Sequence, residues 1–311
     1  MACEQAVQDA AVTAEPFRCS TRSLALGEEM TGTASHVHRW LLLEHPGPWG
    51  RNALADSRLP PAVCLRLRDF TLAGVRCLLI RRHGRTPPGG GTRVVVASTA
   101  PGDTWMEGAD LAGPEALLDI EVEGLRRGRR PGLVPMTDPV YLVCTHGRHD
   151  ACCAERGRPL AATLAVEYPD QTWECSHIGG DRFAANLVCL PHGIYYGRLT
   201  PSAGLEVAAA YADGRLDLDH VRGRSGYAFA AQAAETFVRR RFALTGIDDV
   251  RALGQRPDGD VTEVRLAARD GERYTVRVRR DAAEQARLLT CHAQHPAHPP
   301  RFQLSADAPE S

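Results

Sequence analysis

The chain has 311 residues, of which 43% are hydrophobic and 24% charged, and its formal net charge is -1. These values are ordinary for a soluble globular protein, and the length suggests about two domains. A net charge so close to zero creates no overall field that would draw the chain to nucleic acid or to a membrane surface, so we expect neither as a partner.

The first segment of the chain, residues 1–16, lacks the basic start and the apolar core of a signal peptide, and we expect it to be a disordered tail. No window approaches the roughly 18 apolar residues that a membrane span needs. We therefore expect a cytoplasmic protein, in which thiols stay reduced and clustered cysteines indicate a metal or redox site.

Residues 17–134 are expected to form an N-terminal α/β domain. A helix is predicted over 61–75, because Val63, Leu67 and Phe70 follow the helical period. Residues 115–125 fit a helix or a strand, and the charged, Gly/Pro-rich stretch 126–139 is typical of an irregular boundary. The expected strands cover 38–45, 75–82 and 93–99.

The second half, 135–204, repeats this order of strand, loop, helix, strand and further strand, which indicates a weak internal repeat. Because Gly157 and Pro159 disfavour helix, the helix of this half is expected to begin at about Arg158. The expected strands cover 140–145, 172–178 and a hairpin over 187–199. The rest of the chain, 205–311, is an extension with a helix at 226–243 and a hairpin that turns at Asp270–Gly271.

Four of the ten cysteines fall within 32 positions, in the second half of the chain. Cys144 ends one expected strand, and Cys175 and His177 end another. In an α/β layer, strand ends and the loops that follow them meet at one edge, so several potential ligands converge there. Mixed thiolate and imidazole donors suit zinc or an iron–sulfur centre. The converging candidates are Cys144, Cys153, Cys175, His177 and Asp181.

Three segments in this part of the chain, CTHGRHDACC, HIGGDRFAANLV and GIYYGRLTP, resemble the sucrase/ferredoxin-like family. RCSTRSL and RWLLLEHPGPWGRNAL extend the resemblance into the N-terminal half. The resemblance implies a thioredoxin-like ferredoxin domain and a [2Fe–2S] cluster, with two cysteines on one side and a His-x3-His pair on the other. The cysteines fall on Cys144 and Cys153 and the first histidine on His177. The second falls on Asp181, where this chain departs from the family pattern.

The fourth ligand is open at this point. Asp181 has the right position, although a carboxylate is a harder ligand than imidazole. Cys175 is the alternative, because it lies two positions before His177 on an expected strand and would point to the same face. A third possibility is an incomplete site whose cluster is labile or absent.

Residues around the expected ligands are candidates for holding the cofactor. Gly179 and Gly180 permit a tight turn whose amides approach the cluster, and Asn186 fits a role in pinning the loop. Arg182 is a candidate for neutralising cluster charge, although an exposed arginine is the simpler interpretation. These four positions, Gly179, Gly180, Arg182 and Asn186, are the predicted cofactor-binding residues.

Other cysteines and histidines have simpler interpretations. Cys152 is expected to be a packed neighbour of Cys153, and His146 and His149 to be exposed loop residues or donors to the cluster. The segment 291–300, CHAQHPAHPP, fits a second metal site or a plain tail. Its prolines and the lack of zinc-type spacing favour the tail.

The function expected from these features is one-electron transfer through a [2Fe–2S] cluster, with a redox partner protein as donor or acceptor. One alternative is a thioredoxin-like thiol redox enzyme, although no Cys-x-x-Cys opens a helix. Another is a zinc-bound binding module. Whether the protein is itself an enzyme is left open, and no carboxylate pair suited to glycoside cleavage is evident.

Overall fold

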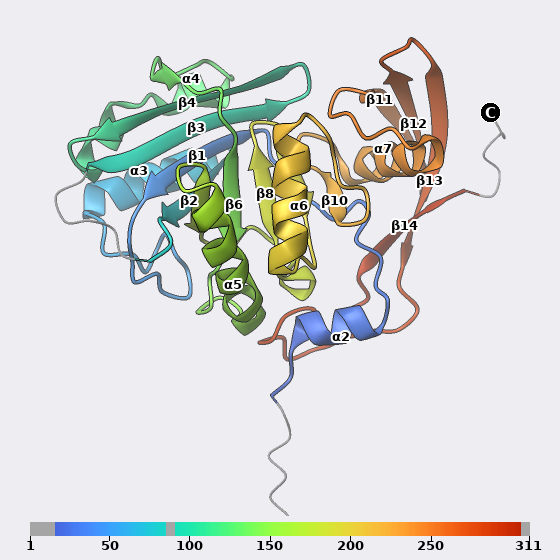
Figure 1. Ribbon diagram of the computed structural model, residues 1–311, viewed down its shortest axis with the longest axis horizontal. Helices are drawn as coiled ribbons and strands as arrows, with labels where there is room; N and C mark the ends of the chain where they lie inside the picture. The colour runs from blue at the N-terminus through green and yellow to red at the C-terminus, as the bar shows by residue number, and fades with distance from the viewer. Residues whose placement is uncertain (1–15, 85–90, 306–311) are drawn as a thin grey trace, which may run out of the picture.

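The computed structural model describes residues 16–84 and 91–305, so nearly all of the predicted disordered tail, 1–16, lies outside the described residues. Within them, ten strands form one mixed sheet, and four more form an antiparallel sheet at one end of the molecule (Figure 1). The α/β class predicted from the sequence is confirmed. No helix among the described residues is long and apolar enough to cross a membrane.

The N-terminal half contains a β-α-β unit followed by two antiparallel strands. β1 (Arg39–Glu44) pairs in parallel with β2 (Val75–Arg81), and α3 (Pro61–Leu72) connects them. β3 (Thr92–Ala100) runs antiparallel to β1, and β4 (Asp103–Leu111) antiparallel to β3. The predicted strands are confirmed, since their apolar runs are buried. The ambiguous stretch after them forms a short 3-10 helix, η1 (Pro114–Asp119), and α4 (Val122–Arg126).

The second half has the same topology, which confirms the internal repeat. Here α5 (Ala151–Glu167) connects the parallel strands β6 (Val140–Cys144) and β7 (Thr172–Cys175). β8 (Leu187–Leu190) pairs antiparallel with β6, and β9 (Ile194–Tyr196) with β8. The strand orders are β4-β3-β1-β2 in the first half and β9-β8-β6-β7 in the second. This is the order of a thioredoxin-like unit, the fold that the family resemblance implies.

The two units join into one sheet through β2 and β7, which pair antiparallel at Ile80 with Cys175 and at Arg81 with Glu174. The short β5 (Val134–Pro135) extends the sheet beyond β4, and β10 (Val221–Arg224), from the C-terminal extension, extends it beyond β9.

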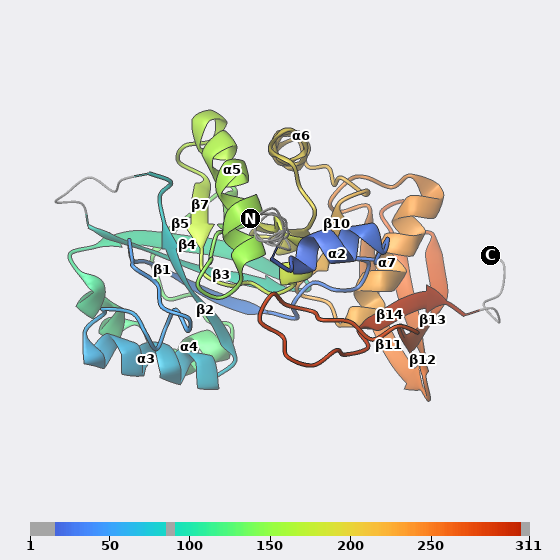
Figure 2. The same ribbon diagram turned by 90° about the horizontal axis from the view of Figure 1, so that it is seen from below.

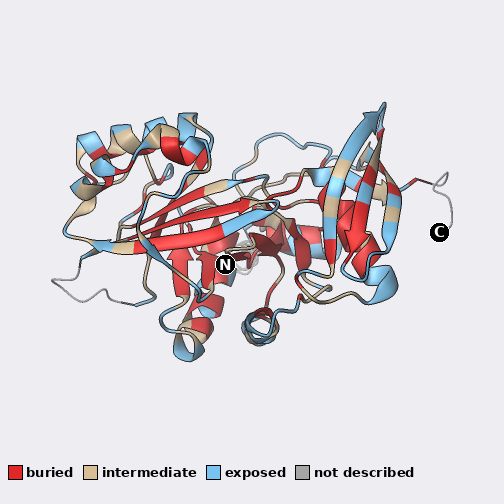
Figure 3. Ribbon diagram, turned by 90° about the horizontal axis from the view of Figure 1, so that it is seen from above, coloured by how far each residue is buried: buried red, intermediate tan, exposed pale blue. Residues whose placement is uncertain are grey.

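A shared core fills the space between the two units. The sheet is curled, so that the faces not covered by helices pack against each other. At this contact, the ring centroids of Trp40 in β1 and Tyr195 in β9 are 6.3 Å apart. α3 covers the opposite face of the first unit, whereas α5 and α6 (Pro201–Ala212) cover that of the second (Figure 2). The central strands of the ten-stranded sheet are buried along most of their length, whereas the outer helix faces and much of the second sheet are exposed (Figure 3). Cys144, Cys153 and Cys175 belong to this shared core.

The C-terminal extension contains α7 (Phe229–Phe242), which packs on the four-stranded sheet. This confirms the predicted helix and the hairpin at Asp270–Gly271. The chain then returns, over 283–299, to the N-terminal helix α2 (Cys19–Ala25) (Figure 2). The strands of the second sheet are β11 (Val250–Asp258), β12 (Val261–Ala268), β13 (Arg273–Ala282) and β14 (Pro300–Leu304).

Candidate metal centre

The helix that carries Cys153 begins earlier than predicted. α5 starts at Ala151, where the Asp150 carboxylate caps it by accepting a hydrogen bond from the Cys152 amide at 2.9 Å. The predicted start at about Arg158 was wrong, because the helix contains both Gly157 and Pro159, the residues that were expected to disfavour it. A Cβ at Gly157 would lie 2.1 Å from the Cys144 carbonyl oxygen, so glycine lets the helix pass directly against the end of β6. This close approach places Cys153 beside Cys144.

Two buried thiols and an imidazole form a compact group at this point. Cys144 and Cys153 are each 1% exposed. Their Sγ atoms and a ring nitrogen of His177 all lie within 4.8 Å of one another. The Cys153 thiol also donates to Asp181 Oδ1 at 3.1 Å. The structure therefore brings together all four residues onto which the family's ligands fall.

The His177 ring lies inside this group and pairs with the Asp181 carboxylate. Its Nδ1 is buried and lies 2.9 Å from Asp181 Oδ1, but the contact lacks hydrogen-bond geometry. An imidazole among two thiols and a carboxylate is a donor set typical of a metal site. His149 stacks on His177 with ring centroids 3.7 Å apart, and its Nε2 lies 3.8 Å from Asp181 Oδ2.

The charges of this group are interdependent. The neighbouring Cys153 thiol holds the pKa of Cys144 well below its usual value, and the same contact raises the pKa of Cys153. Burial alone would lower the pKa of His177, but contacts with Asp181 and Cys144 raise it to about 9. Burial opposes ionisation of Asp181 as well, yet His177 keeps its pKa below the usual range. Thiolate, imidazolium and carboxylate thus stabilise one another.

Cys175, the alternative fourth ligand, does not share a strand with His177, as had been expected from the sequence. β7 ends at Cys175 instead of continuing to 178, so the argument that Cys175 and His177 share a strand face was wrong. Ser176 explains the early end, because its amide donates to the Leu79 carbonyl at 2.8 Å and its hydroxyl accepts from the Leu79 amide at 3.1 Å. Cys175 is fully buried and belongs to none of the metal-capable groups among the described residues.

The loop that carries His177 and Asp181 turns at two glycines in left-handed conformations, Gly179 (φ 97°) and Gly180 (φ 81°). Arg222 of β10, which is 1% exposed, lies beneath the turn and donates to the Gly179 carbonyl at 3.0 Å and to Asn186 Oδ1 at 2.8 Å. Asn186 donates in turn to the Gly180 carbonyl at 2.9 Å. Sequence reasoning missed Arg222, because it lies in a polar, Gly-containing stretch, DHVRGRSGY, that gives no signal of burial.

Arg182 and His146 lie in places that their sequence positions did not indicate. The Arg182 guanidinium pairs with Glu28 at 2.7 Å and lies over the Phe183 ring. His146, expected to be exposed, is only 3% exposed. It accepts from the His177 amide at 3.3 Å through Nδ1 and contacts the Gly50 carbonyl at 2.7 Å through Nε2, so it supports the loop beneath His177.

The histidine side of the group opens into a cleft of about 550 Å³ between the two units. Arg51 and Arg76 contribute positive charge to its wall, and Asp56 contributes a carboxylate that caps the Asn52 amide at 2.8 Å. The His177 side chain is 25% exposed and the His149 side chain 36%, in contrast to the buried thiols. The group is therefore reachable from solvent only on its histidine side.

A family model, sucrase/ferredoxin-like, matches residues 30–223, more than half of the chain. The chain belongs to the sucrase/ferredoxin-like family. No curated protein and no solved structure matches it. The family match contains Cys144, Cys153, His177 and Asp181 and ends just after Arg222, but it does not reach the segments that carry Cys19 and Cys291.

Proposed function

We propose that the protein is an iron–sulfur redox protein that transfers one electron through a [2Fe–2S] cluster held by Cys144, Cys153, His177 and Asp181. The observation that carries the proposal is the grouping of the half-buried His177 ring with two buried thiols and the buried Asp181 carboxylate. These four donors form two pairs, thiol with thiol and imidazole with carboxylate, as a cluster with two ligands on each iron requires.

The donor types fit this cofactor. Thiolates are the usual ligands of cluster iron, and imidazole ligation raises the potential relative to an all-cysteine site. When bound, such a cluster accepts and returns a single electron. The nine cysteines among the described residues are all free thiols, which is consistent with the reducing cytoplasm where we propose that the protein acts.

The protein itself would orient the ligands and control access to them. Arg222 and Asn186 hold the turn at Gly179 and Gly180, so His177 and Asp181 keep their positions relative to α5. The shared core excludes water from the thiol side. A redox partner protein would then dock at the cleft, because His177 is the most exposed of the proposed ligands, and Arg51 and Arg76 favour an acidic partner surface there.

The test is an analysis of anaerobically purified protein for iron, acid-labile sulfide, visible absorption and EPR. We expect two iron and two sulfide per chain and a rhombic EPR signal on reduction, as for a protein-bound [2Fe–2S] cluster. Cys153→Ser should remove most of the iron. Cys189→Ala is the matched control, because Cys189 is equally buried but faces the other core of the second unit.

Three outcomes would overturn the proposal. A colourless protein with zinc that is lost in Cys153→Ser would support the zinc-bound module, because Zn²⁺ has no visible bands. A metal-free protein with a Cys144–Cys153 disulfide would support a thiol redox enzyme. A protein that stays empty after cluster reconstitution would show that Asp181 marks a lost site.

A further inference from the structure

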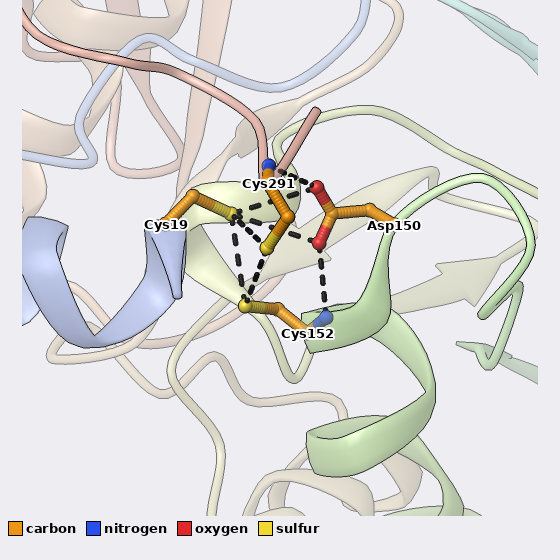
Figure 4. Close-up of side chains that lie close together, drawn as sticks. All are labelled: Cys19, Asp150, Cys152 and Cys291. Atoms are coloured by element: carbon orange, nitrogen blue, oxygen red, sulfur yellow. Dashed lines mark hydrogen bonds between the residues drawn. The ribbon is translucent and has the colours of Figure 1, made fainter. Parts of the chain in front are cut away.

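Three cysteines far apart in the sequence meet on the outer side of α5. Cys19 begins α2, Cys152 lies in the first turn of α5, and Cys291 lies in the segment 283–299 that returns from the C-terminal sheet (Figure 4). Their Sγ atoms are 3.3 Å apart for Cys152 and Cys291, 3.6 Å for Cys19 and Cys291, and 3.7 Å for Cys19 and Cys152. These sulfurs form a nearly regular triangle.

The triangle has the dimensions of one face of a tetrahedral metal site. Zinc–sulfur bonds of about 2.3 Å in a tetrahedron place two sulfurs about 3.8 Å apart. The two distances that involve Cys19 are close to this value and the Cys152–Cys291 distance is shorter, so the three thiols are near enough to ligate a single ion. They are far from the roughly 2.05 Å of a disulfide bond.

Asp150 supplies a fourth donor in the same place. Its two carboxylate oxygens accept from the Cys152 amide at 2.9 Å and from the Cys291 amide at 2.7 Å. Both oxygens also lie 3.7 Å from the Cys19 sulfur. The amides fix the carboxylate so that it faces the thiols, as groups around a metal centre commonly do.

Burial and charge favour a cation here. Asp150 is 0% exposed and Cys19 and Cys152 are 1% exposed, whereas Cys291 is half-buried and leaves a path from solvent. The N-terminus of the 17-residue α5 stabilises negative charge at Cys152. Without a metal the buried Cys19 thiol keeps its proton and donates to Asp150, and a divalent cation would offset the repulsion that ionisation of the three thiols beside this carboxylate creates.

This group is distinct from the candidate iron–sulfur site. Cys152 and Cys153 are adjacent, but successive helix residues point about 100° apart. Cys153 faces the core between the units, and Cys152 packs with Cys19, Cys291 and Ala184. The family match includes neither Cys19 nor Cys291. Cys152 is buried, as expected, but it packs with Cys19 and Cys291, and the segment that carries Cys291 lies against α2 and the start of α5.

We propose that Cys19, Cys152, Cys291 and Asp150 form a site for one zinc ion. The four donors come from α2, from the start of α5 and from the segment 283–299. The ion would therefore link the N-terminal helix and the C-terminal segment to the second unit. Each thiol must lose its proton when the ion binds. This inference does not depend on the proposed [2Fe–2S] function.

Zinc and iron contents of the full-length protein, measured together, test the proposal. We expect about one zinc per chain in the unchanged protein and in the control Cys64→Ser, whose thiol is partly buried elsewhere. Cys19→Ser and Cys291→Ser should each lose most of the zinc and leave the iron content and visible spectrum unchanged. Co²⁺ in place of zinc should give the intense visible bands of a tetrahedral thiolate site, and these bands should be absent in both variants.

A second measurement avoids variants that fail to fold. Titration of the unchanged protein with an organomercurial should release one zinc as the thiols are blocked. The proposal would be overturned by a protein without stoichiometric zinc, by zinc that both variants retain, or by a Cys152–Cys291 disulfide found by peptide mapping under non-reducing conditions.

Discussion

Asp181 is the residue at which the chain departs from the His-x3-His pattern that the family resemblance implies. It is 4% exposed and in contact with Cys153 and His177, so its carboxylate occupies the place expected for the second imidazole. A carboxylate brings a negative charge where a neutral ring would bring none. This difference has a measurable consequence for a cluster bound there, because reduction adds one more negative charge.

Asp181→His should therefore raise the midpoint potential by tens of millivolts. The neutral ring removes an anion beside the group that accepts the electron, so the reduced form becomes easier to reach. The measurement is an EPR-monitored redox titration, with Asp170→His as a control at an exposed position. An unchanged potential with full iron content would show that Asp181 is not a ligand.

His192 is a second residue whose environment sets a pH dependence. Burial, helped by Arg224 and opposed by Asp248, lowers its pKa to about 4, and its Nδ1 lies 2.6 Å from the Tyr211 hydroxyl. The unfolded chain, with a histidine pKa of about 6.5, binds more protons between pH 6.5 and 4. The free energy of unfolding should thus fall as the pH falls through this window.

Between pH 7.5 and 4, the His192→Gln variant should lose roughly 2 kcal/mol less of its free energy of unfolding than the unchanged protein. This value is reduced to account for the partial exposure of His192 to solvent. The measurement is urea unfolding at several pH values between 7.5 and 4. His220→Gln is a control of opposite sign, because Asp217 raises the pKa of His220 and its stabilisation is lost as the pH rises. Equal slopes for the unchanged protein and His192→Gln would contradict the assignment.

At the scale of elements, α5 and β6 set the geometry of the candidate site. Their contact at Gly157 has no space for a side chain, because the neighbouring atom is the Cys144 carbonyl oxygen. Backbone cannot move aside as a flexible side chain can. A wider separation of helix and strand would therefore move Cys153 away from Cys144.

Gly157→Ala should destabilise the protein by about 1–3 kcal/mol, the usual cost of overpacking, and should lower its iron content. Gly204→Ala in α6 is the matched control, because its Cβ would meet only the end of the Leu160 side chain. Urea unfolding and iron analysis of both variants provide the comparison. Normal iron content in Gly157→Ala would show that the helix–strand contact does not govern the site.

At the scale of the whole molecule, the two units form the cleft through which the histidine side of the site meets solvent. Arg51 and Arg76 lie on its wall, and Arg76 also donates to the His177 carbonyl at 2.7 Å. The chain's net charge is only -1, so any steering of a charged partner depends on this local distribution.

Arg51→Glu should slow oxidation of the reduced protein by ferricyanide several-fold at low salt and speed oxidation by hexaammineruthenium(III). The first reagent is an anion and the second a cation, so the opposite changes isolate the charge effect, which high salt should suppress. Stopped-flow absorbance measures both rates. Arg148→Glu, an exposed arginine outside the residues that line the cleft, is the control. Parallel changes with both reagents would contradict docking at the cleft.

Local patterns determined much of this protein. Alternating and continuous apolar runs predicted the strands of both units and their repeated order, and the position of Cys144, Cys175 and His177 at expected strand ends indicated a metal-binding group. These features depend on residues that are near one another along the chain, where side-chain periodicity is a direct signal. The predicted start of α5 was wrong because Gly157 was interpreted by its low helix propensity. Its close contact with the Cys144 carbonyl oxygen gives no signal in the sequence.

Only the tertiary structure decided the rest. The curled sheet places the two units against a common core, Arg222 reaches the glycine turn from β10, and Cys19 and Cys291 meet Cys152 from the two ends of the described chain. No local pattern signals such contacts, because they join segments up to 272 positions apart, and their free energy depends on packing that exists only in the folded molecule.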